Sequence, residues 1–313
     1  MTSTAPLWTI RVCVLGAFAA TLWFAGPRAA DVLAARFGPD AQKSPPVTLD
    51  HVAFAESPSW LTPPMLVEVS SALSPWLSDE VPILDEPTSR RLRDGLASVA
   101  WVRDVRIARL FPNQFRLHLE LRRPLLAVHD ADDRPLCLVD RDAVVLPFVA
   151  NDLPKLRLYR EGGLPNMDVR EGAVASDRRV LVGARIAVEW REQLAPLVEA
   201  CPRLLEIDAT NLDEQWVRGP EYPEVRVHLA RADASPVVFA YGRPVRSELP
   251  RVPVTAKASV LRNVLAKHPA LEGLVAGDLR FERRWSDYLQ PRPAGTADPF
   301  GPWRDLPPVV GGR

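Results

Sequence analysis

Five aspartates form the densest acidic group in the sequence, and they are the first candidates for chemistry. Asp130, Asp132 and Asp133 are followed shortly by Asp140 and Asp142. Carboxylates that lie this close together can bind a divalent cation. Their spacing lacks the alternating ligands, central glycine and closing glutamate of a calcium loop, and aspartate is a favoured turn residue. We therefore predict solvated turns between strands.

The other residue types that carry catalytic or ligand chemistry are scattered. The five histidines include no pair spaced for zinc on one helix face, and no serine nucleophile elbow, phosphate-binding glycine loop or Cys-His spacing occurs. Lysine plus arginine equals aspartate plus glutamate at 39 each, so no broad positive field for nucleic acid is expected. We predict a protein without catalysis, metal or cofactor, and without nucleic-acid binding.

The three cysteines are too few for a disulfide scaffold. Cys13 lies in an apolar run, and Cys137 and Cys201 are far apart in the sequence. We interpret the last two as small buried side chains. A bridge between them is the alternative, and it requires Cα atoms within roughly 7 Å of each other.

An apolar segment near the amino terminus predicts a membrane anchor. Residues 7–26 carry one charge, and a helix of this length spans a hydrocarbon core of roughly 30 Å. Aromatic residues near both ends and an arginine one turn inside fit a retained span. The anchor residues singled out are Leu7, Trp8, Arg11, Leu15, Leu22 and Trp23. The alternative is a cleaved signal peptide, with a mature chain that begins near Asp31.

The anchor divides the chain into a short cytoplasmic tail, residues 1–6, and an extracytoplasmic part that starts with a linker, residues 27–46. Residues 47–124 follow as a first domain, in which alternating and helical patterns give the order strand, helix, helix, strand, strand. This order predicts a compact two-layer α+β unit, with both helices on one face of a three-stranded sheet.

Residues 125–289 predict a second domain of antiparallel strands with two helices. The clearest helix covers residues 178–200, with Ile186, Trp190, Leu194 and Leu197 on one apolar stripe. A second helix covers residues 256–267, and a last strand runs from Leu274 to Trp285. The Pro- and Gly-rich tail, residues 290–313, has almost no periodic apolar pattern, and we expect it to be disordered.

The combination of one anchor and these two domains resembles the FtsQ/DivIB family of bacterial cell-division proteins. The most specific match lies at residues 96–113, where Trp101-Val102, Val105, Arg109 and Pro112 are similar to the family's L-x-x-x-P-W-V-x-x-V-x-V-x-R-x-W-P. Ala100 and Phe111 depart from that pattern. Further matches are Arg123-Pro124, Leu138-Val139-Asp140, Lys257 and Asp278-Leu279-Arg280-Phe281.

The resemblance implies a single-pass protein of the bacterial cytoplasmic membrane, with a POTRA domain followed by a β domain outside the cytoplasm. It implies a scaffold that binds other division proteins during septum formation. The implied partners are small bitopic coiled-coil proteins and the septal peptidoglycan synthase complex.

Two surfaces are candidates for partner binding. A last strand beside a disordered tail is expected to be a sheet edge, which can accept a strand from another chain. Arg103, Arg106 and Arg109 form a possible docking face on the first domain, although a solvated face explains them as well. The edge-strand residues are Asp278, Leu279, Arg280, Phe281, Glu282, Arg283, Arg284 and Trp285.

Two other functions stay open from the sequence. One is a POTRA-bearing factor for envelope assembly or secretion, and depletion without a division defect would favour it. The other is a secreted enzyme with a cleaved signal peptide.

Overall fold

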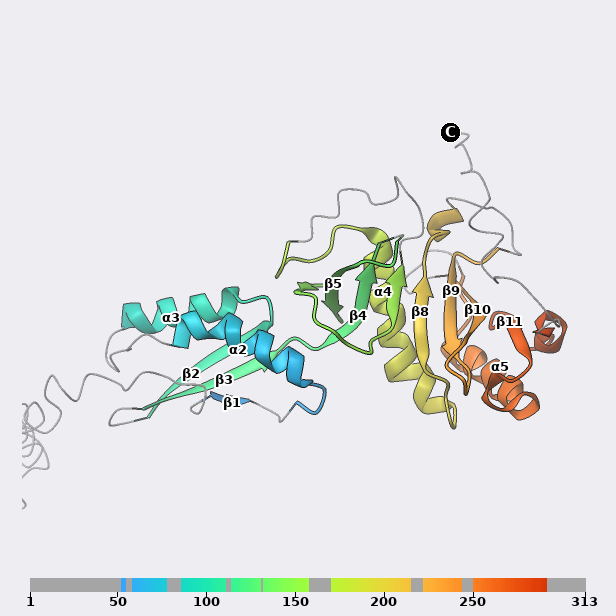
Figure 1. Cartoon of the computed structure of the whole chain (residues 1–313), viewed down its shortest axis with the longest axis horizontal. Coiled ribbons are helices and arrows are strands. Elements are labelled where there is room, and N and C mark those ends of the chain that lie inside the picture. Colours follow the sequence, from blue (N-terminus) through green and yellow to red (C-terminus); the bar gives the residue numbers. More distant parts are fainter. Residues whose placement is uncertain are drawn as a thin grey trace, which may run out of the picture. The chain divides into compact units, whose positions relative to one another are not determined.

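A computed structural model describes residues 52–54, 58–77, 86–110, 114–130, 132–157, 170–214, 222–243 and 250–291. They form a mixed α+β structure with a small and a large sheet (Figure 1). The chain divides into two compact units, one centred on each sheet, and residues 59–69 and 99–103 group with the second.

The predicted anchor, linker and carboxy-terminal tail lie outside the described residues, except for residues 290 and 291. Within the described ranges, no helix is long and apolar enough to cross a membrane.

The first unit contains a three-stranded sheet of order β1-β3-β2, in which β1 runs parallel to β3. The strands are β1 (Val52–Phe54), β2 (Val102–Leu110) and β3 (Gln114–Leu121), and the helices are α2 (Pro63–Leu77) and α3 (Glu86–Ser98). Both helices lie on one face of the sheet, as Figure 1 shows. The predicted order of strand, helix, helix, strand, strand is confirmed.

The core of the first unit forms where the apolar stripes of the helices meet one face of the sheet. Leu73 of α2 and Leu96 of α3 are fully buried. Leu117 and Leu119 of β3 are also buried, and their spacing of two places both on the same face of that strand. Alternation along β3 therefore selects its buried face.

The second unit contains a nine-stranded sheet within the described residues, of order β12-β11-β10-β9-β8-β7-β4-β5-β6. Its strands are β4 (Pro124–His129), β5 (Pro135–Asp140), β6 (Val145–Leu146), β7 (Lys155–Arg157), β8 (Leu204–Asp208), β9 (Val225–Ala230), β10 (Pro236–Gly242), β11 (Leu274–Asp278) and β12 (Gln290–Pro291).

The predicted all-antiparallel arrangement of this sheet is wrong, because three of its strand pairs are parallel: β4 with β7, β7 with β8, and β10 with β11. A parallel pair needs a long crossover instead of a tight turn, and a helix usually supplies it. Here α4 (Arg178–Glu189) connects β7 to β8, and α5 (Val254–Lys267) connects β10 to β11. The two helices that the sequence predicts are therefore the crossovers.

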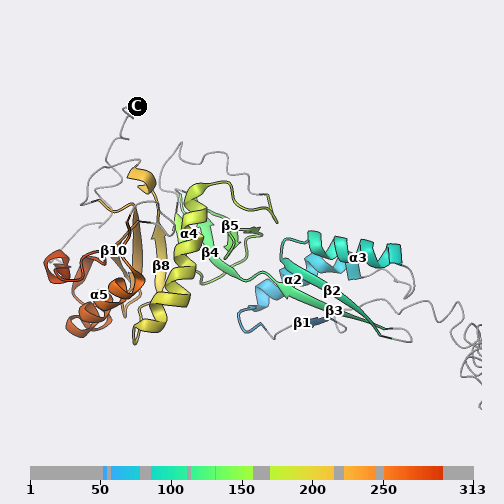
Figure 2. The ribbon, with the colours of Figure 1, turned by 180° about the vertical axis from the view of Figure 1, so that it is seen from behind.

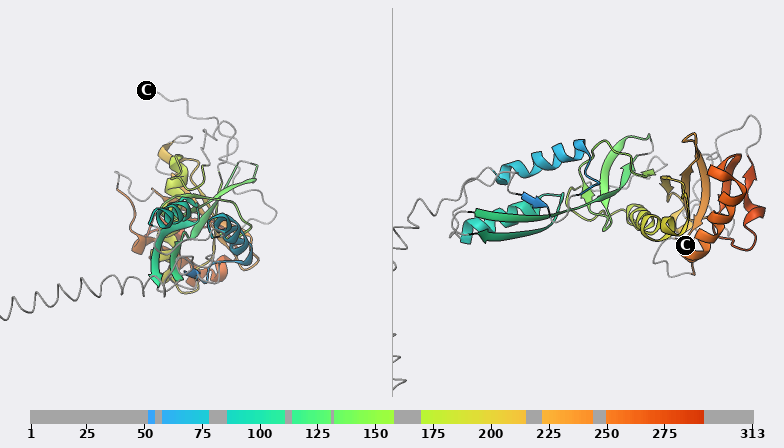
Figure 3. Two further views of the ribbon diagram at one scale, coloured as in Figure 1. Left: turned by 90° about the vertical axis from the view of Figure 1, so that its left-hand side faces the viewer. Right: turned by 90° about the horizontal axis from the view of Figure 1, so that it is seen from below.

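Helices α4 and α5 cover one face of the large sheet (Figures 2 and 3). Helix α4 begins at an N-cap, because the Asp177 side chain accepts a hydrogen bond of 2.7 Å from the backbone N–H of Arg179. Ile186 on α4 and Val260, Leu261 and Val264 on α5 are fully buried against the sheet.

The helical stretch that follows α4 changes pitch. It continues as a π-helical turn, Trp190–Leu194, and then as a 3-10 turn, Ala195–Leu197. Trp190 and Leu194 remain buried, but Leu197 is exposed. The predicted stripe is therefore wrong at its last member, because a stripe drawn with 3.6 residues per turn drifts once the pitch changes.

Candidate docking site at the end of the large sheet

The candidate site is built around β11, the last strand with more than two residues in the described part of the sheet. Its inner side pairs with β10, with Val238 opposite Ala276, Phe239 opposite Gly277 and Ala240 opposite Asp278. The ladder continues one residue further, because the N–H of Leu279 donates to the carbonyl of Ala240 at 3.0 Å.

The outer side of β11 is only partly paired, and Gly277 and Asp278 are buried. Strand β12 registers with Leu274 and Ala276 across an irregularity. No strand among the described residues registers with Gly277 or Asp278 on that side. We call the outer side of Gly277 and Asp278 the docking edge.

The predicted edge strand is wrong beyond Asp278. Leu279 and Arg280 form a turn, and Trp285–Tyr288 is a 3-10 helix. The side chain of Asp278 explains the break, because its carboxylate accepts a hydrogen bond of 2.8 Å from the backbone N–H of Arg280. Aspartate ends strands in this way by offering the backbone a local acceptor.

The guanidinium of Arg280 folds back onto the same carboxylate. Its Nη2 donates to Oδ2 of Asp278 at 2.7 Å, and its Nε donates to Oδ1 at 3.0 Å. A bidentate, charge-assisted pair fixes both planes. This pair therefore holds the turn that follows the docking edge.

Four half-buried apolar side chains gather after the turn, and we call them the aromatic corner: Phe281, Trp285, Tyr288 and Leu289. Phe281 stacks on Tyr288 with 4.3 Å between ring centroids and 13° between planes. The ammonium of Lys267 at the end of α5 lies 5.9 Å from the Trp285 ring centroid. Trp285 and Leu289 also pack against the core of the second unit.

Charged residues flank the aromatic corner. Glu282, Arg283 and Arg284 are exposed, and Arg284 donates to Asp287 at 3.0 Å. Aromatic residues and arginine are the types enriched at protein–protein interfaces. The docking edge and the corner together therefore have the chemistry of a protein-binding surface, with main-chain groups for a partner strand and rings for its side chains.

An ionic cluster lies beneath this end of the sheet, and it consists of three buried residues and one exposed residue, Arg251. The buried members are Glu189, Tyr241 and Lys257. Glu189 ends α4, Tyr241 lies on β10, Arg251 precedes α5 and Lys257 lies on its first turns. The Tyr241 hydroxyl and the Lys257 ammonium donate to Oε1 of Glu189, the latter at 3.3 Å, and Arg251 donates to Oε2 at 2.5 Å. The ammonium also lies 3.4 Å from the centroid of the Tyr241 ring.

The ionic cluster shifts the pKa values of its members. Burial lowers the pKa of Lys257 to about 8, although the Glu189 carboxylate pulls it upward. Burial alone would raise the pKa of Glu189, but Lys257, Tyr241 and Arg251 together outweigh that effect and lower it. Burial and the adjacent carboxylate raise the pKa of Tyr241. Glu189 is therefore ionised at neutral pH, and Tyr241 is a neutral donor.

The three arginines of the predicted docking face all lie on β2, and Arg103 and Arg106 are exposed. Arg103 lies 3.5 Å from Asp142, and Arg106 lies 2.9 Å from Asp104. Arg103 and Arg106 therefore both lie near acidic side chains, and the docking face stays a prediction.

The aspartates singled out from the sequence do lie in turns. Oδ1 of Asp130 accepts from the backbone N–H groups of Asp132 and Arg134, at 2.9 and 2.8 Å. Asp140 repeats the pattern with Asp142 and Val144, at 2.9 and 2.8 Å. The turn prediction is confirmed for both, but the expected solvation is wrong, because Asp130 and Asp140 are buried.

The two cysteines of the second unit are free thiols. Cys137 is buried and Cys201 is half-buried, so the bridge left open by the sequence is not formed. Burial raises the pKa of Cys137 to about 12 and that of Cys201 to about 11.

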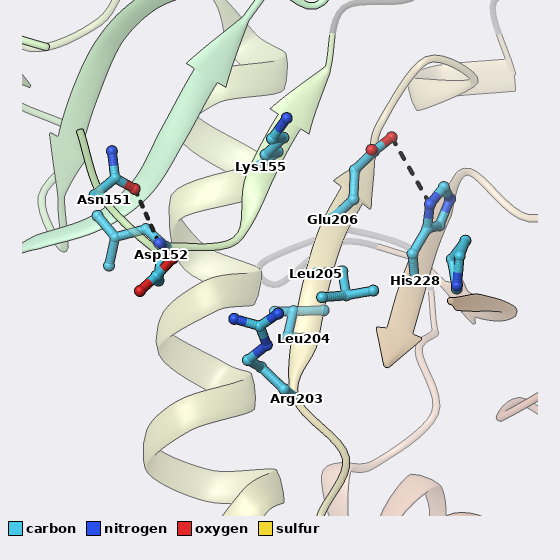
Figure 4. Close-up of a pocket in the computed structure, with 10 residues that line it drawn as sticks. Asn151, Asp152, Lys155, Arg203, Leu204, Leu205, Glu206 and His228 are labelled. Carbon is cyan, nitrogen blue, oxygen red and sulfur yellow. Dashed lines mark hydrogen bonds and ion pairs between the residues drawn. The ribbon is translucent and has the colours of Figure 1, made fainter. Parts of the chain in front are cut away.

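A pocket of about 430 Å³ lies on the large sheet, and Figure 4 shows its side chains on the near side of the strands with a helix behind them. Lys155, Glu206 and His228 are neighbours across β7, β8 and β9. The ammonium of Lys155 pairs with Asp133 at 3.1 Å, and Nδ1 of His228 lies 3.8 Å from Oε1 of Glu206. Because these groups face charges of the protein itself, we assign the pocket no function.

Reasoning from the sequence missed most of the ionic cluster. Lys257 was noted only through the family resemblance, and Glu189, Tyr241 and Arg251 were not singled out. A signal existed for Lys257, because Val260, Leu261 and Val264 follow it at spacings of three, four and seven, which places its side chain on the apolar face of α5.

Comparison with protein-family models and with curated proteins finds no match to this chain.

Proposed function

We propose that this chain is a membrane-anchored, non-catalytic scaffold of the bacterial cell-division machinery. Residues 7–26 hold it in the cytoplasmic membrane as a single span, residues 47–124 form a POTRA domain and residues 125–289 form a β domain that docks partners outside the cytoplasm. The support is the FtsQ/DivIB resemblance at residues 96–113, together with the order of elements in the first unit.

The observation that carries the docking function is the incomplete strand pairing of β11. Strand β12 registers with Leu274 and Ala276, and among the described residues no strand registers with Gly277 or Asp278 on the outer side. Main-chain groups at a sheet edge are a template for an added strand. The aromatic corner lies next to this edge in sequence and supplies rings for side-chain contacts.

The proposed partners are small bitopic coiled-coil proteins of the division complex, and through them the septal peptidoglycan synthase complex. The exposed Arg283 and Arg284 favour a partner segment that carries acidic side chains beside its docking strand.

The test is a pull-down of the full chain from bacterial membranes, with captured proteins identified by mass spectrometry. Reversing the charges with Arg283→Glu/Arg284→Glu should lower capture of division proteins by roughly tenfold, because complementary charges become repulsive. Both side chains are exposed, so the fold should persist. Arg262→Glu is the matched control, since Arg262 is an exposed arginine on α5, and its capture should equal that of the unchanged chain.

Three results would contradict the proposal. Equal capture by the double variant would place docking elsewhere, and capture of no division protein by any form would remove the division role. If depletion leaves division intact while envelope assembly or secretion fails, the chain is an assembly factor of that kind.

A further inference from the structure

The ionic cluster joins the segments that lead into the docking edge. Glu189 comes from the end of α4, Tyr241 from β10, and Arg251 and Lys257 from the start of the crossover to β11. The carboxylate of Glu189 receives all three donors. One side chain of α4 therefore fixes the first turns of α5 on the strand next to β11.

The charge of the cluster indicates a role other than stability. It contains one carboxylate and two cations, and the side chains of Glu189 and Lys257 are only 2% and 1% exposed. Burying ions is expensive, and replacing a buried ion pair by apolar side chains of similar size is often neutral or stabilising. A hydrogen-bonded ion pair, however, is directional, whereas apolar contacts are not, so the pair restricts how its two elements pack.

The path from α5 to the docking edge is short. Helix α5 ends at Lys267, a 3-10 turn covers Pro269–Leu271, and β11 begins at Leu274. Leu271 is fully buried, so the connection is held against the core. Because β11 registers with β10 at only three positions, its placement depends strongly on the helix that delivers it.

We propose that Lys257 and Glu189 are positioning residues for the docking edge, an inference that rests on the proposed docking function. Their ion pair fixes how α5 packs on β10. This packing in turn fixes the position of β11 in the sheet. Partner binding then depends on a pair that touches no partner.

The experiment uses the full chain in membranes or detergent and the apolar variant Glu189→Leu/Lys257→Met. Hydrogen–deuterium exchange is followed in a peptide that covers Leu274–Leu279, beside the melting temperature and the pull-down of division proteins. We expect a lower melting temperature for the double variant, because Arg251 and Tyr241 lose their acceptor. Exchange should be at least tenfold faster in this peptide and not in peptides of β4 and β5, and capture should fall by a similar factor. In the single variant Lys257→Met, Glu189 still accepts hydrogen bonds from Tyr241 and Arg251. This single variant is used for the same measurements if the double variant does not fold.

The control is Arg122→Met, which removes a partly buried ion pair with Asp140 of 2.9 Å near β4 and β5, several strands away from β11. It should leave exchange in Leu274–Leu279 unchanged. Unchanged exchange in the Glu189 and Lys257 variants would overturn the positioning role, and so would equal acceleration in the control. The unchanged chain could also capture no division protein while exchange in the variants is still faster. That result would support the positioning of β11 by the ion pair and would contradict only the proposed function.

Discussion

At the scale of single residues, Glu189 is the buried carboxylate at the centre of the ionic cluster. It is ionised, 2% exposed in its side chain, and it receives hydrogen bonds from Tyr241, Arg251 and Lys257. Removing one partner of a buried ion pair leaves the other charge uncompensated, which costs about 3–5 kcal/mol. The two cations of the cluster make Glu189 the member whose loss is most costly.

Glu189→Gln should therefore lower the free energy of unfolding at pH 7 by about 3 kcal/mol. It should also change the dependence on pH. The folded pKa of Glu189 lies below its ordinary 4.5, so its stabilisation is complete above about pH 4.5 and is lost as the pH falls through the folded value. The glutamine variant lacks this component, and its free energy of unfolding should fall less steeply with acid.

Urea unfolding at pH 7 and at successively lower pH, followed by circular dichroism, measures both effects. Glu192→Gln is the control, because Glu192 is exposed and pairs with Arg141 at 3.6 Å only. Equal acid dependence for the unchanged chain and Glu189→Gln would show that the carboxylate does not stabilise the fold.

At the scale of elements, the placement of β11 depends on a close approach to β10. A Cβ atom built on Gly277 would lie 2.4 Å from Cε1 of Phe239, whose side chain is fully buried. Real side chains do not reach such distances, so a residue larger than glycine must move either the strand or the ring. Gly277 therefore sets how closely β11 packs in the sheet.

Gly277→Ala should destabilise the chain by about 1–3 kcal/mol, because it overpacks a rigid core. Adding Phe239→Leu removes the ring atoms in the way, so the double variant should be more stable than the sum of the two single changes predicts. Thermal or urea unfolding of the four forms measures this coupling. Strict additivity would mean that the two residues do not press on each other.

At the scale of the whole molecule, the proposal requires one orientation in the membrane. Equal numbers of acidic and basic residues, 39 of each, give no net charge for binding to nucleic acid or to an anionic surface. Under the proposal, the apolar segment at residues 7–26 is the feature that would fix the location.

Protease added to spheroplasts should digest the extracytoplasmic part of the chain, whereas inverted membrane vesicles should protect it. Amino-terminal sequencing of the membrane-bound protein should begin at or near Met1. A mature chain that begins near Asp31 would instead indicate a cleaved signal peptide and a secreted protein.

The sequence by itself determined the local structure of this protein. Helical periodicity predicted the start of α4 and both ends of α5 within about two residues, and the patterns of residues 47–124 predicted the order of elements in the first unit. Turn chemistry assigned Asp130 and Asp140 correctly. These features depend on neighbours in the chain, which a sequence pattern contains.

Only the tertiary structure decided the pairing of strands and the ionic cluster. The parallel pairing of β10 with β11 depends on how α5 packs. Strand β11 ends at Asp278 because the carboxylate of that residue accepts a hydrogen bond from the N–H of Arg280. Glu189 and Lys257 are 68 positions apart and meet only because α4 and α5 share one face of the sheet. Contacts across such separations leave no periodic trace in one sequence, because each partner alone looks like an ordinary charged residue of a helix.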